Sequence, residues 1–303
     1  MPLPSRKIFL KQTALVAAGS LLGLSFTRIK QPPKLSFSTL ACPDWTLEEI
    51  IHFASSNKYK GIELRGIKRE LDLTKVPELS ATNRATTLRK IKELNLKIVN
   101  LGSSSTLHFS PGAERDKNIL QGKQFIDLAQ ELECPYVRVY PNNFLKEREK
   151  SATMQLIAEG LRELGDYAKA SPVKVLIETH GDLVWTADIE ALMKMVNLPN
   201  VGIVWDFCNM WTVTRENISE MYPRLKPYIY HTHIKDANLI DNKPQYVFLG
   251  KGEVPIIKVI DLLQKDNYKG FYSFEWEKLW HPELADPELA LADYAKVFPI
   301  AKT

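Results

Sequence analysis

The chain has 303 residues, of which 45% are hydrophobic and 25% charged, and its formal net charge is +4. This size and apolar content suit one large globular domain or two small ones. Much of the small excess of basic residues lies in the first thirty-odd positions, so composition gives little support for a nucleic-acid-binding protein. The three cysteines are widely spaced without a CxxC pair, which excludes a disulfide framework and a zinc ribbon.

The first residues have the pattern of a targeting sequence. Residues 5–11 are basic, and residues 13–26 are apolar or small, too short a run for a membrane span but suited to a signal peptide. The order Ser-Arg-Lys-x-Phe-Leu-Lys resembles a twin-arginine signal, with Lys7 in place of the second arginine. The alternative is an amphipathic first helix, but no polar face recurs with helical period.

We therefore expect residues 1–33 to form a leader outside the fold. The protein would then be exported to the periplasm, by the twin-arginine or the general route. We expect no stable membrane span once the leader is removed.

After the leader, strands and helices alternate. Residues 34–42 alternate as a strand, and Thr46 with Glu49 has the spacing of a capping box at the start of a helix. The later pattern predicts strands at 61–64, 96–101, 136–140, 173–178, 201–206, 228–236 and 270–275, and helices at 85–94, 116–132, 153–170, 187–196, 219–225, 256–264 and 287–297.

These eight strand–helix units predict a (β/α)8 TIM barrel. No linker or low-complexity stretch divides residues 34–303, so we expect a single barrel domain. A doubly wound open sheet is the alternative, but no GxGxxG follows the first strand.

The strand at 228–236 carries His231 and His233, followed by Lys235 and Asp236. Two histidines two residues apart on a strand point to the same side, since side chains alternate. They could be core histidines satisfied by hydrogen bonds. The residues at the ends of other strands favour a functional site over this structural role.

The last four predicted strands end in Glu178, Asp206, His233 and Glu275. In a barrel these ends are neighbours on one rim. Three carboxylates and an imidazole would repel each other there unless a cation lay between them. An oxygen-rich set with one nitrogen suits Mn²⁺ or Mg²⁺, with Co²⁺ or Zn²⁺ possible, and we predict a metal site.

An ordered set of motifs surrounds these residues: Ile177-Glu-Thr-His180, Trp205-Asp206, His231-Thr-His-Ile-Lys-Asp236, Gly250-Lys-Gly-Glu-Val-Pro255 and Phe274-Glu-Trp-Glu277. From about residue 35 to its end, the chain resembles the sugar phosphate isomerase/epimerase family of xylose isomerase-like TIM barrels. The resemblance implies that Glu178, Asp206, His233 and Glu275 bind one divalent ion, with Mn²⁺ preferred. It also implies that Glu178 and Glu275 are the acid/base pair, acting through an enediolate.

One position departs from the family pattern. Many epimerase relatives carry a histidine three residues after the aspartate of the sixth strand, where this chain has Asn209. An asparagine can hydrogen-bond a substrate hydroxyl but cannot exchange a proton near neutral pH. This substitution therefore disfavours an epimerase activity of the standard kind.

Other residues are candidates for substrate binding. Besides Asn209 they are His180, Lys235, Asp236 and Trp276, at or near the strand ends. A capping or supporting role for His180, a solvated rim charge for Lys235 and packing for Trp276 are the alternatives. We further expect Glu63 and Arg138 to form a structural ion pair, and His231 to support the site rather than bind the metal.

The expected function is a divalent-metal-dependent isomerase or epimerase of a sugar-like small molecule. The alternative is a lyase or deglycosidase that acts on 3-keto sugars by proton abstraction and β-elimination, which Asn209 also permits. Export argues against a phosphorylated substrate. The sequence leaves open which stereocentre reacts and whether the chain forms a homo-oligomer.

Two further functions are disfavoured. A DNA-repair endonuclease of this architecture would hold three metals with many more ligands, but Asn209 stands in place of an expected histidine and no Asp-x-His follows Asp236. The six histidines of the chain do not assemble such a site, so no nucleic-acid partner is expected. A sugar-binding barrel without catalysis would not need the four predicted ligands.

Overall fold

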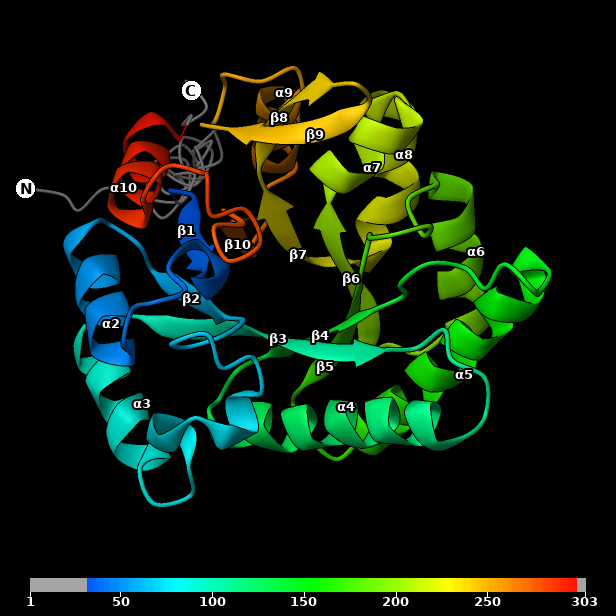
Figure 1. The fold of residues 1–303 in the computed structure, drawn as a ribbon, viewed down its shortest axis with the longest axis horizontal. Coiled ribbons are helices and arrows are strands. Elements are labelled where there is room, and N and C mark those ends of the chain that lie inside the picture. Colours follow the sequence, from blue (N-terminus) through cyan, green and yellow to red (C-terminus); the bar gives the residue numbers. More distant parts are fainter. Residues whose placement is uncertain (1–31, 299–303) are drawn as a thin grey trace, which may run out of the picture. The chain divides into compact units, whose positions relative to one another are not determined.

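The computed structural model describes residues 32–298, so the predicted leader lies outside this range except for its last two residues. Eight parallel strands close into a barrel in the order β1-β10-β7-β6-β5-β4-β3-β2 (Figure 1). The predicted (β/α)8 barrel is confirmed. The strands are β1 (Lys34–Ser38), β2 (Gly61–Leu64), β3 (Lys97–Thr106), β4 (Tyr136–Tyr140), β5 (Lys174–Glu178), β6 (Val201–Asp206), β7 (Ile229–Ile234) and β10 (Phe271–Phe274).

Helices cover the outside of the barrel. Each predicted helix is present, the last with the predicted bounds and the others with small shifts, and Thr46 and Glu49 form the predicted capping box. None of the helices within residues 32–298 is long and apolar enough to cross a membrane. The helices are α2 (Leu47–Ser56), α3 (Arg84–Glu93), α4 (Ala113–Glu131), α5 (Lys150–Ala168), α6 (Thr186–Val196), α7 (Phe207–Thr214), α8 (Ile218–Leu225), α9 (Ile256–Lys265) and α10 (Pro287–Val297), with the 3-10 turns η1 (Thr39–Ala41), η2 (Leu73–Lys75), η3 (Pro77–Leu79) and η4 (Lys226–Tyr228).

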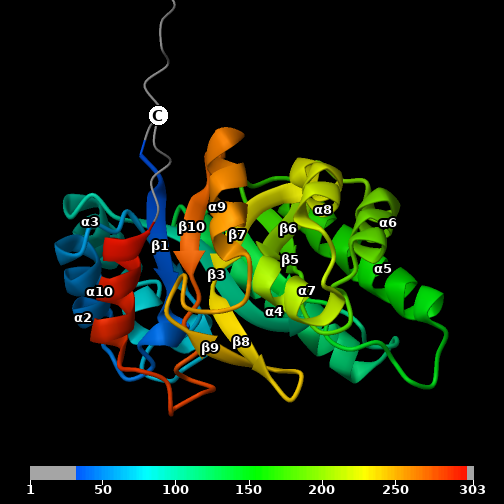
Figure 2. The ribbon, with the colours of Figure 1, turned by 90° about the horizontal axis from the view of Figure 1, so that it is seen from above.

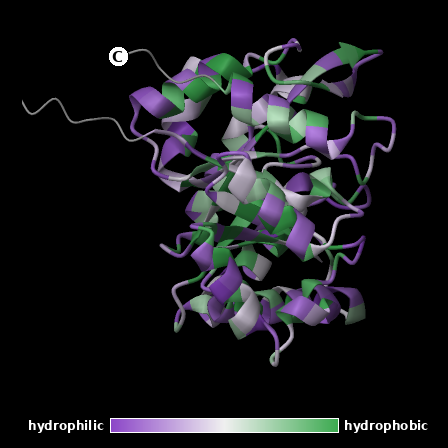
Figure 3. Cartoon of the chain, turned by 90° about the vertical axis from the view of Figure 1, so that its left-hand side faces the viewer, coloured by the Kyte–Doolittle hydropathy of each residue, from purple (hydrophilic) through white to green (hydrophobic). Residues whose placement is uncertain are grey.

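The strands are buried on both sides, as the sequence suggested. Strands β2 and β6 are buried along their whole length, because one side fills the barrel and the other packs against helices. Figure 3 shows hydrophobic residues concentrated in the middle of the molecule and hydrophilic residues more often on the outer helices and loops. Polar residues inside the barrel are therefore exceptions that require partners.

Between the strand predicted at 228–236 and the helix predicted at 256–264, where the sequence was expected to form only a long loop, the structure has further strands. They form an antiparallel hairpin, β8 (Asp236–Ile240) and β9 (Lys243–Val247), and the strand predicted to reach residue 236 ends at Ile234. The hairpin turns through Asp241 and Asn242, both at positive φ. An Asp-Asn pair is a weaker hairpin signal than the usual Asn-Gly or Asp-Gly, which explains the omission.

Two other segments differ from the prediction. Helix α7 follows β6 directly and was not predicted, because the apolar residues after Asp206 continue the pattern of the strand. Strand β3 continues to Thr106, five residues beyond the end predicted at residue 101. Figure 2 shows the β8–β9 hairpin at the end of the barrel toward which β1 and β10 run, the rim where the strands deliver their last side chains.

Candidate active site

The four predicted metal ligands meet at this rim. Glu178 and Asp206 end β5 and β6, His233 is next to last in β7, and Glu275 follows β10. All four are buried, and one ligand atom from each can be chosen so that all lie within 4.8 Å of one another. The order β10-β7-β6-β5 puts Glu275 and Glu178 on the two outer sides, with His233 and Asp206 between them.

His233 presents one ring nitrogen to the three carboxylates. Its Nδ1 lies 3.3 Å from Glu275 Oε2 and 3.6 Å from both Asp206 Oδ2 and Glu178 Oε1. This nitrogen is buried and has no hydrogen-bond partner within residues 32–298. Burial lowers the pKa of His233, but Glu275, Glu63 and Glu178 raise it well above its ordinary value. The position of Nδ1 therefore favours a positive charge, which a divalent cation would supply in place of a proton.

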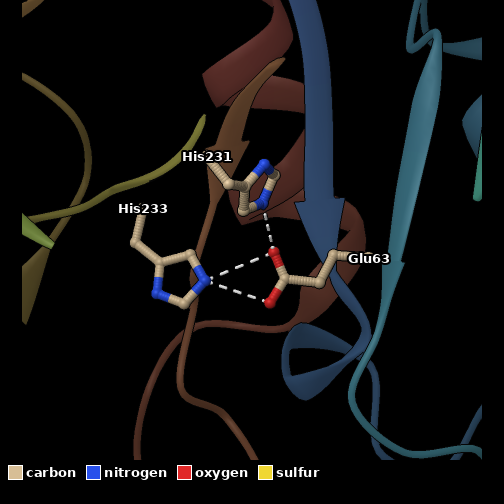
Figure 4. A group of neighbouring side chains, drawn as sticks. All are labelled: Glu63, His231 and His233. Carbon is tan, nitrogen blue, oxygen red and sulfur yellow. Dashed lines mark hydrogen bonds and ion pairs between the residues drawn. The ribbon is translucent and has the colours of Figure 1, made fainter. Parts of the chain in front are cut away.

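Glu63 of β2 holds the other ring nitrogen of His233. Figure 4 shows its carboxylate between the two histidines of β7. His233 Nε2 lies 3.0 Å from Glu63 Oε1, and His231 Nε2 lies 2.8 Å from Glu63 Oε2, which also accepts a 3.0 Å hydrogen bond from Ser273. If His233 donates from Nε2, its Nδ1 is left as the acceptor that a metal requires.

The expected ion pair between Glu63 and Arg138 is therefore wrong. Burial raises the pKa of Glu63, but His233 and His231 more than offset this and hold it below its ordinary value. The three residues Glu63, His231 and His233 are also close enough to hold an ion, yet their hydrogen bonds already account for the arrangement. The sequence signal that could have identified Glu63 as the partner of the two histidines is a glutamate between apolar residues of a short strand.

Arg138 pairs instead with Glu178. Its Nε lies 3.2 Å from Glu178 Oε2, and its guanidinium stacks on the Tyr140 ring, 3.7 Å from the ring centre. Burial raises the pKa of Glu178, but Arg138 and His233 lower it by more. The pKa therefore lies below its ordinary value, and the carboxyl group stays charged. Arg138 thus leaves the other oxygen of Glu178 facing the cluster.

Lys235 contacts the opposite side of the cluster. Its Nζ lies 2.8 Å from Glu275 Oε2, 2.9 Å from Asp206 Oδ2 and 2.5 Å from Glu277 Oε1. The side chain is buried, so the alternative of a solvated rim charge is wrong. Burial lowers the pKa of Lys235, but Asp206, Glu275 and Glu277 raise it well above its ordinary value.

The charges around the cluster support one divalent ion. Its carboxylates Glu178, Asp206, Glu275 and Glu277 contact two cationic side chains, Arg138 and Lys235. With His233 neutral, as a metal ligand must be, these side chains leave two negative charges, which one divalent cation would balance. The structure therefore fits a divalent metal held by Glu178, Asp206, His233 and Glu275.

Asp236 is occupied by the backbone of the following loop. Its Oδ1 accepts from Ala237 N at 2.9 Å, and its Oδ2 from Gly250 N at 2.8 Å and Gly252 N at 2.9 Å. A Cβ at position 252 would lie 2.2 Å from Asp236 Oδ1, so this close approach requires glycine. The carboxylate fixes the loop, and its predicted substrate contact stays a prediction.

The remaining substrate-binding candidates differ in availability. His180 is half-buried 4.9 Å from the Tyr140 ring, and its Nδ1 has no hydrogen-bond partner in the described part of the chain. Asn209 Nδ2 donates to Thr179 O at 3.3 Å, and Trp276 is buried with its indole donating to Ala285 O at 2.9 Å. His180 is the most available of the three for a ligand.

Comparisons with known proteins show the family. The family model for the xylose isomerase-like TIM barrel matches residues 51–296. The chain belongs to this family.

Among the xylose isomerase-like relatives is the 3-dehydroshikimate dehydratase of Bacillus anthracis, 24% identical over 244 residues that cover 75% of this chain and 84% of the relative. The IOLI protein, whose crystal structure contains a zinc atom, has a TM-score of 0.73 at 19% identity and covers 87% of this chain and 95% of its own. L-ribulose 3-epimerase has a TM-score of 0.71 at 17% identity, with 88% and 93% covered. At these identities the solved structures show the shared fold.

Proposed function

We propose that this protein is a divalent-metal-dependent isomerase or epimerase of a sugar or sugar-derived molecule. The observation that carries the proposal is the buried cluster of Glu178, Asp206, His233 and Glu275, with the two glutamates on its outer sides. Three oxygen ligands and one nitrogen favour Mn²⁺, with Mg²⁺, Co²⁺ or Zn²⁺ as alternatives. A divalent cation there would polarise a substrate carbonyl and ease loss of the neighbouring proton.

Glu178 and Glu275 would move that proton. Arg138 and His233 lower the pKa of Glu178, and His233 and Lys235 lower the pKa of Glu275, so both carboxyl groups stay charged and can accept a proton. Because the two glutamates flank Asp206 and His233, one can take the proton on one side of a planar intermediate and the other can return it on the opposite side. Epimerisation needs this arrangement of two bases.

A second candidate function is elimination by a lyase, which two observations favour. Lys235 donates to Glu275 Oε2 at 2.8 Å, so an ammonium group stands beside the proposed base and could protonate a leaving group. One relative is a dehydratase by name, and loss of water from a ketone can begin with the same proton removal. The lyase would act on 3-keto sugars or glycosides.

The test is solvent deuterium exchange by NMR. The full chain, loaded with Mn²⁺, is incubated in D₂O with a panel of free ketoses and 3-keto sugars. We expect deuterium next to the carbonyl with the wild type, and a loss of at least 100-fold with Glu275→Gln. No exchange by the Mn²⁺-loaded protein on any substrate in the panel would refute the proposal.

The same experiment separates the two functions. Epimerisation or isomerisation returns a stereoisomer or positional isomer, whereas elimination releases the substituent and leaves an unsaturated product. Under the lyase function, Lys235→Met would slow release of the substituent more than it slows deuterium exchange. Metal content measured by plasma mass spectrometry controls for lost metal.

We also propose that the protein is exported, on the basis of the basic and apolar pattern in residues 1–33. Fractionation of cells that express the full chain with a C-terminal tag tests this. Recovery in the periplasmic fraction, reduced by replacing Arg6 and Lys7 with glutamine, is expected. Recovery of the wild type only in the cytoplasm would contradict it.

A further inference from the structure

A cavity of about 510 Å³ lies between the β8–β9 hairpin and the segment that follows β10. Its volume is in the range of pockets that bind small molecules. Tyr246, Phe248 and Trp276 form aromatic walls, and Leu284 adds an aliphatic one. None of these residues belongs to the proposed metal cluster.

Lys235 lies beside both that cluster and Tyr246 in the cavity wall, although it does not itself line the cavity. Lys235 Nζ lies 5.2 Å from the centre of the Tyr246 ring and 2.8 Å from Glu275 Oε2. Trp276, on another wall, directly follows Glu275 in the chain. A molecule that reacts at the cluster could therefore extend a second group into the cavity.

The lining suits an aromatic group. The rings of Phe248 and Trp276 lie 5.7 Å apart, and the Trp276 indole N–H is already bonded to Ala285, so this wall offers ring faces rather than hydrogen bonds. The polar side chains at the cavity are those of the exposed residues Gln245, Lys251 and Glu283 and of the half-buried residues Tyr246 and His281. The ring faces of Phe248 and Trp276 are the part of the lining that suits a planar aromatic ring, which would pack against them.

We propose that this cavity binds the aromatic aglycone of a 3-keto glycoside, whose oxidised sugar ring supplies the carbonyl that reacts at the cluster. The inference rests on the proposed function, because it takes the metal cluster as the reacting end. It narrows the substrate class to sugars that carry an aryl substituent. A free monosaccharide would leave the cavity empty.

The test compares two probes by isothermal titration calorimetry on the full chain loaded with Mn²⁺. The probes are 4-nitrophenyl β-D-glucopyranoside and methyl β-D-glucopyranoside, which share the sugar and differ in the aglycone. We expect the nitrophenyl glucoside to bind at least ten-fold more tightly. Equal affinities, or no binding of the nitrophenyl glucoside, would overturn the proposal.

Two variants locate the effect in the cavity. Phe248→Ala removes a wall and Leu284→Trp fills the space, so both should bring the affinity for the nitrophenyl glucoside down to that of the methyl glucoside. Trp185→Ala, which removes an exposed aromatic side chain outside the cavity, should change neither affinity. A preference for the nitrophenyl glucoside that survives in both cavity variants, with their Mn²⁺ content unchanged, would overturn the proposal.

Failure of the two proposals can be told apart. A protein that binds no divalent metal contradicts the proposed function. A protein that binds Mn²⁺ through His233 but does not prefer the aryl glucoside contradicts only the aglycone site.

Discussion

Glu63 shows how one buried residue can set the chemistry of another. It accepts hydrogen bonds at Oε1 and Oε2 from the histidines of β7 and from Ser273, and it has no solvent exposure. Its negative charge makes His233 a stronger electron donor through the shared hydrogen bond. Glu63 would thus tune a metal that it does not touch.

We predict that Glu63→Gln weakens Mn²⁺ binding by about 10- to 100-fold, because the amide removes the charge that supports His233. Titration calorimetry with Mn²⁺ measures the affinity. Glu93→Gln, an exposed glutamate beside Arg89, is the matched control and should bind like the wild type. An unchanged affinity in Glu63→Gln would show that the hydrogen bonds only hold the histidines in place.

Arg138 should set the pH dependence of metal binding at the site through its effect on Glu178. Burial raises the pKa of Glu178, while Arg138 lowers it, with a net decrease. The carboxylate is therefore charged above this lowered pKa, and metal binding should be lost only as the pH falls through it. Without Arg138, burial would dominate and the carboxyl would protonate at higher pH.

We predict that Arg138→Met moves the acidic limit of Mn²⁺ binding upward by about one pH unit or more. Mn²⁺ binding measured across a pH series gives this limit. Arg138→Lys keeps the positive charge and should shift the limit less. A limit at the same pH in all three proteins would contradict the role given to Arg138.

At the scale of elements, the β8–β9 hairpin is fixed to the rim by Asp236. Its carboxylate accepts from Ala237 at the start of the hairpin and from Gly250 and Gly252 after it. The hairpin carries Tyr246, which lies over Lys235. Asp236 therefore links the start of the hairpin to the loop that follows the hairpin, beside the cluster.

We predict that Asp236→Ala releases the backbone amides of Gly250 and Gly252, since each loses a hydrogen bond to a charged group of about 1.5–3 kcal/mol. Hydrogen–deuterium exchange should become faster in a peptide that covers residues 248–254. Glu253→Gln, in the same loop, removes a charge but keeps an acceptor and should leave the rate unchanged. Equal protection in Asp236→Ala would contradict this anchoring.

At the scale of the whole molecule, closure of the barrel makes the cluster possible. Strand β1 pairs with both β2 and β10, so the first and last strands meet and the sheet has no free edge. The four metal-ligand candidates come from consecutive strands of this closed sheet. A cation bound between them would link four strands, and it should therefore stabilise the fold.

We predict that Mn²⁺ at 100 times its dissociation constant raises the free energy of unfolding by about 2.7 kcal/mol, because the ion binds the folded state. Urea denaturation with and without Mn²⁺ measures the difference. His233→Ala should show little effect. An equal gain in His233→Ala would place the ion elsewhere on the molecule.

The sequence by itself determined the barrel and the residues at its rim. Strands and helices alternate with local periods, and the ends of β5 and β6 could be predicted because neighbouring residues in the chain carry that pattern. This pattern also predicts that four residues meet at the rim, because parallel strands of one barrel end on the same rim. They are Glu178, Asp206, His233 and Glu275. Asp241 and Asn242, with their weak turn signal, show where local information was insufficient.

Only the tertiary structure decided the partners of those residues. Glu63 and His231 lie 168 positions apart in the chain, and Lys235 and Glu275 lie 40 apart. Which of these side chains meet depends on strand register and on closure of the barrel, and no local pattern contains either. Glu63 therefore pairs with the histidines rather than with Arg138, and Lys235 is buried on the cluster, because a buried charge in a closed barrel must take the partner that the fold puts within reach.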